Sequence, residues 1–251
     1  MCIRDSSITN QQADVALATR YKTNATLKGT AMKVGFQYET PIKEEISLYL
    51  GGTFELENEI DTEGQEYLFS VALGQFDSPR DTILNRETVG ILRAPLKSTV
   101  GFGLGAVNKW FVSADYSFQE ALELDGAVLN NYTKINYDKY TKFAIGGYFI
   151  PKINSITSYW DRVVYRAGIR MEKTGLLVDP SGNGTDFTAI DDFGISFGVG
   201  LPMKNGISSL NLGFELGKRG NSSNGLVQEN YVNFRMSLSL GDKWFKKLEI
   251  F

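Results

Sequence analysis

Five charged residues in the C-terminal half of the chain are the best candidates for a ligand-binding surface. Each lies on the polar side of a segment in which apolar and polar residues alternate: Arg166, Arg170, Glu172, Glu215 and Arg235. Every second side chain of a β-strand points to the same face, so we expect these charges to share one surface. They could pair with one another and stiffen that surface, which is the interpretation we favour, or they could bind the carboxylate of a ligand.

The rest of the sequence offers little for catalysis. It contains no histidine, and its single cysteine is Cys2. Disulfide bonds within the chain, zinc sites built from Cys or His, and Ser-His or Cys-His nucleophiles are therefore excluded. The formal charge is −3, and no cluster of Lys and Arg is interleaved with aromatic residues. We expect a protein that is not an enzyme, requires no cofactor or metal, and binds no nucleic acid.

Two short motifs resemble ligand sites, but each lacks a feature that such a site requires. Residues 101–106 (GFGLGA) fit a dinucleotide-binding pattern by letter, but that site needs a helix to begin there, and Asn108-Lys109 predicts a turn into another strand. These glycines are better explained as making room on one face for neighbouring strands or for a plug. Residues 179–186 (DPSGNGTD) are rich in oxygen donors but lack the spacing of a Ca²⁺ loop, so we expect a mobile surface loop.

The elements that carry these residues are predicted to be membrane-spanning strands. No apolar run approaches the roughly 18 residues of a membrane-spanning helix, whereas apolar residues recur at every second position in many segments. The clearest segments are 32–38, 46–56, 100–106, 110–118, 165–171, 193–201, 210–216 and 232–240, and weaker ones are 67–75, 84–93 and 142–150. We expect an all-β, antiparallel transmembrane barrel with about eleven strands present.

Connector lengths and tryptophans give this barrel an orientation. The connectors at 41–45, 108–109 and 202–208 are short, whereas those at 119–141, 176–189 and 219–228 are long and polar. Outer-membrane barrels have short periplasmic turns and longer extracellular loops. All three tryptophans, Trp110, Trp160 and Trp244, fall near the short-turn end, which predicts an aromatic girdle at that membrane interface. The connector at 151–162 is long for a periplasmic turn, and a small packed segment would explain it.

The first residues do not fit an exported protein. Met1 to Ser6 (MCIRDS) has the character of translated adaptor sequence, and no signal peptide follows. We therefore expect residues 1–6 to be a sequencing artefact and residues 7–251 to be one incomplete barrel domain. An odd number of strands would place the start of the chain outside the cell, as in a barrel that lacks its first strands.

Several stretches resemble the FadL-like outer-membrane transport family. They are residues 94–96 (APL), the glycine-alternating 100–105, 109–111 (KWF), 114–118 (ADYSF), 193–202 (FGISFGVGLP), 211–220 (NLGFELGKRG), 229–231 (ENY) and 242–245 (DKWF). The resemblance implies a monomeric barrel of about 14 strands that takes up hydrophobic compounds such as long-chain fatty acids. It also implies an N-terminal hatch in the lumen, and nothing in this sequence matches one.

The alternating strands and the family resemblance together predict a protein of the bacterial outer membrane. Its partners would be outer-membrane lipid, hydrophobic small molecules and, transiently, the barrel assembly machinery, since the last strand is amphipathic and ends in aromatic residues. Two alternatives remain open. One is a barrel that transports nothing and acts in secretion or assembly, and the other is a soluble all-β binding protein that needs no detergent. If the purified chain stays soluble in water without detergent, it is the soluble binding protein and not a membrane barrel.

Overall fold

The structure is a computed structural model that describes residues 2–10, 17–72, 78–126, 135–203 and 208–241. These residues form strands and two short 3₁₀ turns, η1 (Trp160–Arg162) and η2 (Ser223–Gly225). Every strand pair is antiparallel. The strands are β1 (Cys2–Asn10), β2 (Leu17–Gly29), β3 (Lys33–Lys43), β4 (Ile46–Glu55), β5 (Asn58–Ala72), β6 (Ser78–Ala94), β7 (Lys97–Ala106), β8 (Trp110–Gln119), β9 (Glu123–Gly126), β10 (Ile135–Tyr137), β11 (Tyr140–Phe149), β12 (Val164–Val178), β13 (Thr188–Pro202), β14 (Ser209–Arg219) and β15 (Glu229–Ser239).

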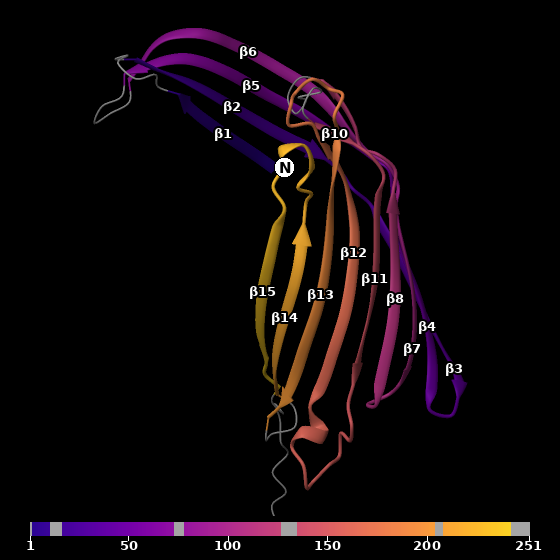
Figure 1. Ribbon diagram of the computed structural model, residues 1–251. Coiled ribbons are helices and arrows are strands. Elements are labelled where there is room, and N and C mark those ends of the chain that lie inside the picture. The colour runs from indigo at the N-terminus through magenta and orange to yellow at the C-terminus, as the bar shows by residue number, and fades with distance from the viewer. Residues whose placement is uncertain (1, 11–16, 73–77, 127–134, 204–207, 242–251) are drawn as a thin grey trace, which may run out of the picture.

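The strands belong to two sheets. A ten-stranded sheet, here called the wall sheet, has the order β15-β14-β13-β12-β11-β8-β7-β4-β3, and β10 pairs with the upper part of β12. A five-stranded sheet, here called the distal sheet, has the order β1-β2-β5-β6-β9. Figure 1 shows the wall sheet as a curved upright surface and the distal sheet as a set of long strands that bends across its upper end.

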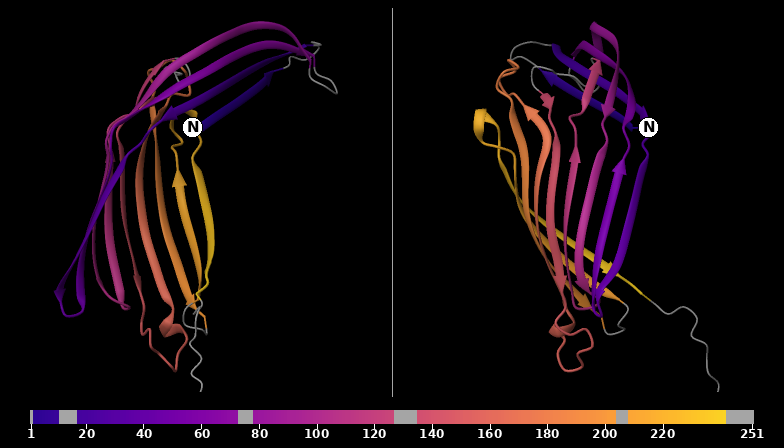
Figure 2. Two further views of the ribbon diagram at one scale, coloured as in Figure 1. Left: turned by 180° about the vertical axis from the view of Figure 1, so that it is seen from behind. Right: turned by 90° about the vertical axis from the view of Figure 1, so that its right-hand side faces the viewer.

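Four chain segments cross from one sheet to the other at the same level. β2 runs into β3, β4 into β5, β6 into β7 and β8 into β9, with interruptions of only two or three residues at 30–32, 56–57, 95–96 and 120–122. The four strands keep the same lateral order in both sheets. The backbone N–H of Leu56 donates to the carbonyl of Met32 at 2.9 Å, so neighbouring segments stay paired at the bend. The distal sheet is therefore a continuation of the wall that turns over its end (Figure 2).

The wall sheet has one continuous apolar face, here called the outer face. Tracing residues that lie opposite one another gives a row that crosses eight strands from β4 to β15. Its members are Leu50, Phe102, Ala114, Ile145, Ile169, Ile195, Leu216 and Val232. One residue further along each strand, the row on the other face is Gly51, Gly101, Asp115, Ala144, Arg170, Gly194, Gly217 and Tyr231. The second face, here called the inner face, is therefore small and polar.

The outer face is not covered by a second layer within the described residues. Only six apolar residues of the described chain are buried, and of these only Ala106 lies on a strand of the wall sheet. Phe197, Phe214 and Phe234 of the outer face are each more than half exposed. Soluble proteins rarely leave contiguous apolar surface of this kind in water. In the part of the chain that the structure describes, the wall sheet thus has no packed core of the kind in which soluble all-β domains bury their apolar residues.

The all-β, antiparallel prediction is confirmed, and a closed barrel is not found. Each of the eleven predicted segments coincides with a strand over most of its length, although residues 73–75 of the segment 67–75 lie outside the described residues. Strands β1, β2, β9 and β10 were not anticipated. In the part of the chain that the structure describes, β3 and β15 end the wall sheet, and each has a neighbour on one side only. The barrel therefore stays a proposal. No helix among the described residues is long and apolar enough to cross a membrane.

The connectors differ in part from the predictions. The loops after residues 119 and 176 are shorter than predicted, because β9 and β10 occupy part of the first and β12 continues to Val178. The short connector after β7 is a tight turn, in which Asn108 has φ 59° and Lys109 N–H donates to the carbonyl of Ala106. Residues 101–106 lie within β7, and no helix begins there, which agrees with the rejection of a dinucleotide site.

The oxygen-rich segment 179–186 folds around one buried carboxylate. One oxygen of Asp179 accepts hydrogen bonds from the backbone N–H groups of Ser181 and Gly182, and the other accepts from those of Gly184 and Thr185. The Ser181 hydroxyl also donates to Asp179, and these bonds lower the pKa of Asp179 to about 2. The carboxylate is thus surrounded by donors, an arrangement that closes the connector and differs from the oxygen cage of a Ca²⁺ site.

Candidate functional site

A network of charged side chains lies on the inner face, on β12 to β15. Its centre is Asp192 of β13, whose side chain is 1% exposed. One oxygen of Asp192 accepts two hydrogen bonds from Arg219, at 2.8 Å from Nε and 2.6 Å from Nη2. The other oxygen accepts from the Tyr231 hydroxyl at 2.8 Å and from Arg170 Nη2 at 3.3 Å. A buried carboxylate needs such partners, because desolvation penalises its charge.

Arg170 joins Asp192 to the rest of the network. Its guanidinium donates to Glu172 at 2.9 Å, to Glu215 at 2.9 Å and to the Tyr231 hydroxyl at 2.8 Å. Arg235 donates to the second oxygen of Glu215 at 3.4 Å. The charged cluster is defined here as Arg170, Glu172, Asp192, Glu215, Arg219, Tyr231 and Arg235. Its three arginines balance its three carboxylates, so it has no net formal charge.

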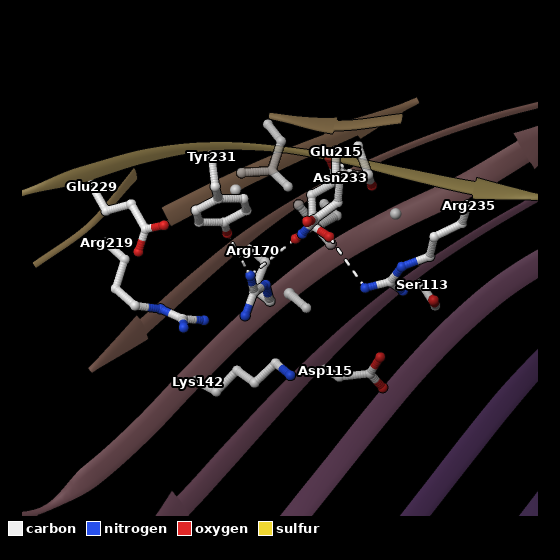
Figure 3. Close-up of a pocket in the computed structure, with 17 residues that line it drawn as sticks. Ser113, Asp115, Lys142, Arg170, Glu215, Arg219, Glu229, Tyr231, Asn233 and Arg235 are labelled. Atoms are coloured by element: carbon white, nitrogen blue, oxygen red, sulfur yellow. Dashed lines mark hydrogen bonds and ion pairs between the residues drawn. The ribbon is translucent and has the colours of Figure 1, made fainter. Parts of the chain in front are cut away.

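Two glycines allow the cluster to form across the sheet. Arg170 and Tyr231 lie three strands apart in one inner-face row, and the two residues between them are Gly194 and Gly217. A Cβ at Gly217 would overlap the Tyr231 ring, and a Cβ at Gly194 would lie 3.1 Å from Glu215 Oε1 and 3.3 Å from the Tyr231 hydroxyl. The long side chains therefore meet over backbone, as Figure 3 shows for Arg170, Tyr231 and Glu215.

The cluster borders a hollow of about 700 Å³ on the inner face. Its lining is polar and includes Ser113, Asp115 and Lys142 from β8 and β11, besides cluster residues (Figure 3). Lys142 lies 3.8 Å from Glu172, so this cation is also paired. Four cationic and three anionic side chains line the hollow. This mixture of both signs on a wide surface suits ion pairing better than capture of a single anion.

Aromatic side chains line a second part of the inner face, close to the short turns. The rings of Tyr49 and Phe111 meet edge to face at 5.3 Å between centroids, and those of Phe111 and Tyr148 stack at 5.9 Å. Phe111 lies over the glycines of β7, since a Cβ at Gly103 would be 2.7 Å from its ring. The β7 glycines thus make room for side chains of the neighbouring strand, as the sequence predicted.

The structure brings four of the five predicted site residues together. Arg170, Glu172, Glu215 and Arg235 belong to the charged cluster, whereas Arg166 donates to Asn211 at 2.9 Å, nearer the short turns. The pairing that we favoured matches these contacts. Binding of a ligand carboxylate by the five residues stays a prediction.

Asp192, Arg219 and Tyr231 were missed at the sequence level. Continuing the alternation of 193–201 backwards by one residue places Asp192 on the polar face, and continuing 210–216 forwards places Arg219 there. The signal was therefore present, but the predicted segments began five residues late in β13 and ended three residues early in β14. The connection of Tyr231 to Asp192 requires knowledge of strand pairing, which the alternation alone does not contain.

Two of the three tryptophans can be placed. Trp110 begins β8 and lies opposite Phe149 of β11, which itself lies opposite Tyr165 of β12, so all three share the outer face. Trp160 lies in η1 at the same end of the wall sheet (Figure 1). Trp244 lies outside the described residues. The aromatic girdle stays a prediction for the three residues.

A family model, BamG, matches residues 3–250 of the chain. No curated protein and no solved structure matches it. The match covers nearly the whole chain and identifies a family other than the FadL-like transporters. The FadL-like resemblance drawn from the glycine-alternating and aromatic stretches was therefore wrong. Alternating glycine and aliphatic residues are a property of any strand with one small polar face, so these stretches could not separate one such family from another.

Removing the central carboxylate should destabilise the wall sheet. In Asp192→Asn, Arg170 and Arg219 keep their charges but lose their shared partner, and we expect the free energy of unfolding to fall by about 2 kcal/mol. The control is Glu59→Gln in the distal sheet, whose partner Arg93 lies 2.9 Å away in an exposed pair, and which should cost less than about 1 kcal/mol. Urea unfolding of the purified protein measures both. Equal losses would show that the cluster does not stabilise the sheet.

Proposed function

Because the chain belongs to the BamG family, we propose that it forms the wall of an outer-membrane barrel protein that acts in barrel assembly. The family name follows those of the components of the barrel assembly machinery, and this supports the assembly role over uptake of fatty acids. In this proposal the chain contacts the machinery as a component and not as a passing client. The observation that carries the membrane placement is the continuous apolar outer face.

The outer face has the character of a lipid-facing surface. The row from Leu50 to Val232 crosses eight strands without a polar residue. A parallel row nearer the short turns contains Trp110, Phe149, Tyr165, Val199, Leu212 and Met236. A membrane barrel needs such an apolar band outside and a polar face inside. In lipid, this exposure would stabilise the sheet, whereas in water it would favour aggregation.

The inner face supports a structural role better than a transport role. Cluster residues extend over the hollow and bind one another across four strands, from β12 to β15. Charges within a membrane protein commonly pair in this way or face water. The proposed wall is therefore held rigid from within, and its end carries the distal sheet away from the membrane.

The proposed orientation places the distal sheet outside the cell. The short turns after β3 and β7 lie at one end of the wall sheet, and the distal sheet lies at the other (Figure 1). With short turns on the periplasmic side, four strands pass from the membrane into the extracellular space. The cross-strand ion pairs Lys28–Glu63 and Arg93–Glu59 of the distal sheet fit an aqueous environment.

A charge on the outer face should prevent membrane insertion, whereas the same charge on the inner face should be tolerated. Phe197 and Ser196 are neighbours in β13 and point to opposite faces. Phe197→Lys should lower the stability of the membrane-embedded protein by about 2–4 kcal/mol, and Ser196→Lys should cost less than about 1 kcal/mol. Heat-modifiable migration of the outer-membrane fraction measures the folded amount. A normal folded amount of Phe197→Lys would contradict the lipid-facing assignment.

Depletion of the protein in its native host tests the assembly role. We expect folded forms of several unrelated outer-membrane barrels to decrease together while their unfolded forms accumulate, because assembly precedes insertion of each of them. Ser196→Lys should restore assembly, and Phe197→Lys should not. Normal folding of all barrels after depletion would refute the proposed function.

A further inference from the structure

The connector between β11 and β12 forms a compact projection with exposed apolar residues at its surface. Residues 150–163 make up this projection. Ile156 is 100% exposed and Trp160 is 66% exposed, and Ile153 and Tyr159 are each about 40% exposed. A group of large apolar side chains exposed to water marks an interaction site more often than a single exposed apolar residue does. Among the described residues, the tips of the β3–β4 and β7–β8 hairpins at the same end of the wall sheet each expose a single large apolar residue, Ile42 at 56% and Val107 at 68%, whereas the projection exposes four.

Internal contacts hold the projection in one conformation. Lys152 N–H donates to the carbonyl of Asp161 at 2.7 Å, and the buried Ser155 hydroxyl donates to the Asp161 carboxylate at 3.1 Å. The Tyr159 hydroxyl donates to the carbonyl of Pro202 at 3.1 Å, which fixes the projection to the end of β13. A preformed surface of this kind loses little conformational entropy when a partner binds.

The position of the projection separates it from the lipid-facing band. Figure 1 shows that it extends beyond the turns that join β3 to β4 and β7 to β8, at the end opposite the distal sheet. Trp160 stays close to the wall, because the Tyr165 hydroxyl of the outer face donates to its carbonyl at 3.2 Å. Ile156 lies on the segment that precedes η1, and polar residues border it on both sides.

The composition of the projection favours a protein over lipid as its occupant. Ile156 is flanked by Ser155 and Thr157, and Lys152, Asn154 and Asp161 are close in the chain. An apolar centre within a polar rim is the ordinary composition of a protein interface. Insertion of the projection among acyl chains would instead require the charges of Lys152 and Asp161 to leave water, which is costly.

We propose that the projection formed by residues 150–163 docks a folded periplasmic protein domain of the assembly complex, with Ile156 inserted into an apolar pocket of that domain. This inference rests on the proposed function, which supplies the compartment and the complex. Ile156 is the central contact, and Tyr159 and Trp160, whose rings meet edge to face at 6.0 Å between centroids, add exposed aromatic surface to the same projection. Interfaces commonly concentrate their binding energy in one such buried residue and its neighbours.

The test compares two substitutions of exposed apolar residues at opposite ends of the wall sheet. Ile156→Asp should lower the amount of barrel assembly complex that co-purifies with the tagged full-length protein by at least about tenfold. The matched control is Val227→Asp in the β14–β15 connector, where Val227 is 85% exposed. This control should leave co-purification unchanged. Outer-membrane fractionation and heat-modifiable migration should be normal for both variants.

The possible results separate the inference from the proposed function. Normal co-purification of Ile156→Asp, or equal losses in both variants, would overturn the inference and leave the assembly role intact. Failure of the unsubstituted protein to co-purify the complex would overturn the proposed function and the inference with it. A fluorophore on Ile156→Cys, in phosphatidylethanolamine and phosphatidylglycerol vesicles, should be insensitive to brominated acyl chains. Quenching by these lipids would assign the residue to the membrane and overturn the protein partner.

Discussion

The wall sheet is a single layer of hydrogen-bonded strands with an apolar outer face and a polar inner face. The rest of the structure depends on this difference between the two faces. Each strand bonds backbone N–H and carbonyl groups to its neighbours, but among the described residues no second layer covers the apolar outer face of the wall sheet. The alternation of side chains is fixed by the backbone, so a shift of one residue in any pair would move apolar residues inward and charges outward. The register across eight strands therefore determines that the outer face requires an apolar environment and the inner face a polar one.

The inner face uses two kinds of residue in a complementary way. Long charged side chains extend across several strands, and glycines beneath them leave the space that this extension needs. Gly217 lies under the Tyr231 ring and Gly194 lies beside Glu215, so the charged cluster depends on these small residues for its space. The cluster is electrically balanced and has its most buried member, Asp192, at its centre, so it stabilises the wall without presenting a net charge to a ligand.

Much of the fold could be predicted from the sequence, because apolar and polar residues alternate strictly in the strands that make up the wall. The segment 193–201 gave β13 and its faces directly, since each residue obeys the pattern. The bend between the two sheets could not be predicted. Residues such as Leu56-Glu57 and Pro95-Leu96 interrupt their strands only briefly, and the alignment of four interruptions at one level is visible only once the strands are paired. The contact between Asp192 and Tyr231 also depends on strand pairing. It could not be predicted, although each residue directly precedes a predicted strand.

The family membership changes the function inferred from this architecture without changing the architecture itself. Strands with a small polar face and an aliphatic face occur in barrels of many functions, so the resemblance to a transporter followed from the fold alone. The BamG match supports a role in assembly, and the features that fit such a role lie at the two ends of the wall sheet. At one end the strands continue into the distal sheet, and at the other the projection of residues 150–163 exposes Ile156.

Contact between the outer face and lipid can be measured with spin labels placed one at a time along residues 193–199 of β13 in the membrane-embedded protein. Labels at Phe193, Ile195, Phe197 and Val199 should collide readily with oxygen and poorly with a water-soluble nickel complex. Those at Gly194, Ser196 and Gly198 should show the reverse preference, giving a period of two residues. Equal access of the nickel complex to both sets would show that both faces meet water and that the outer face does not contact lipid.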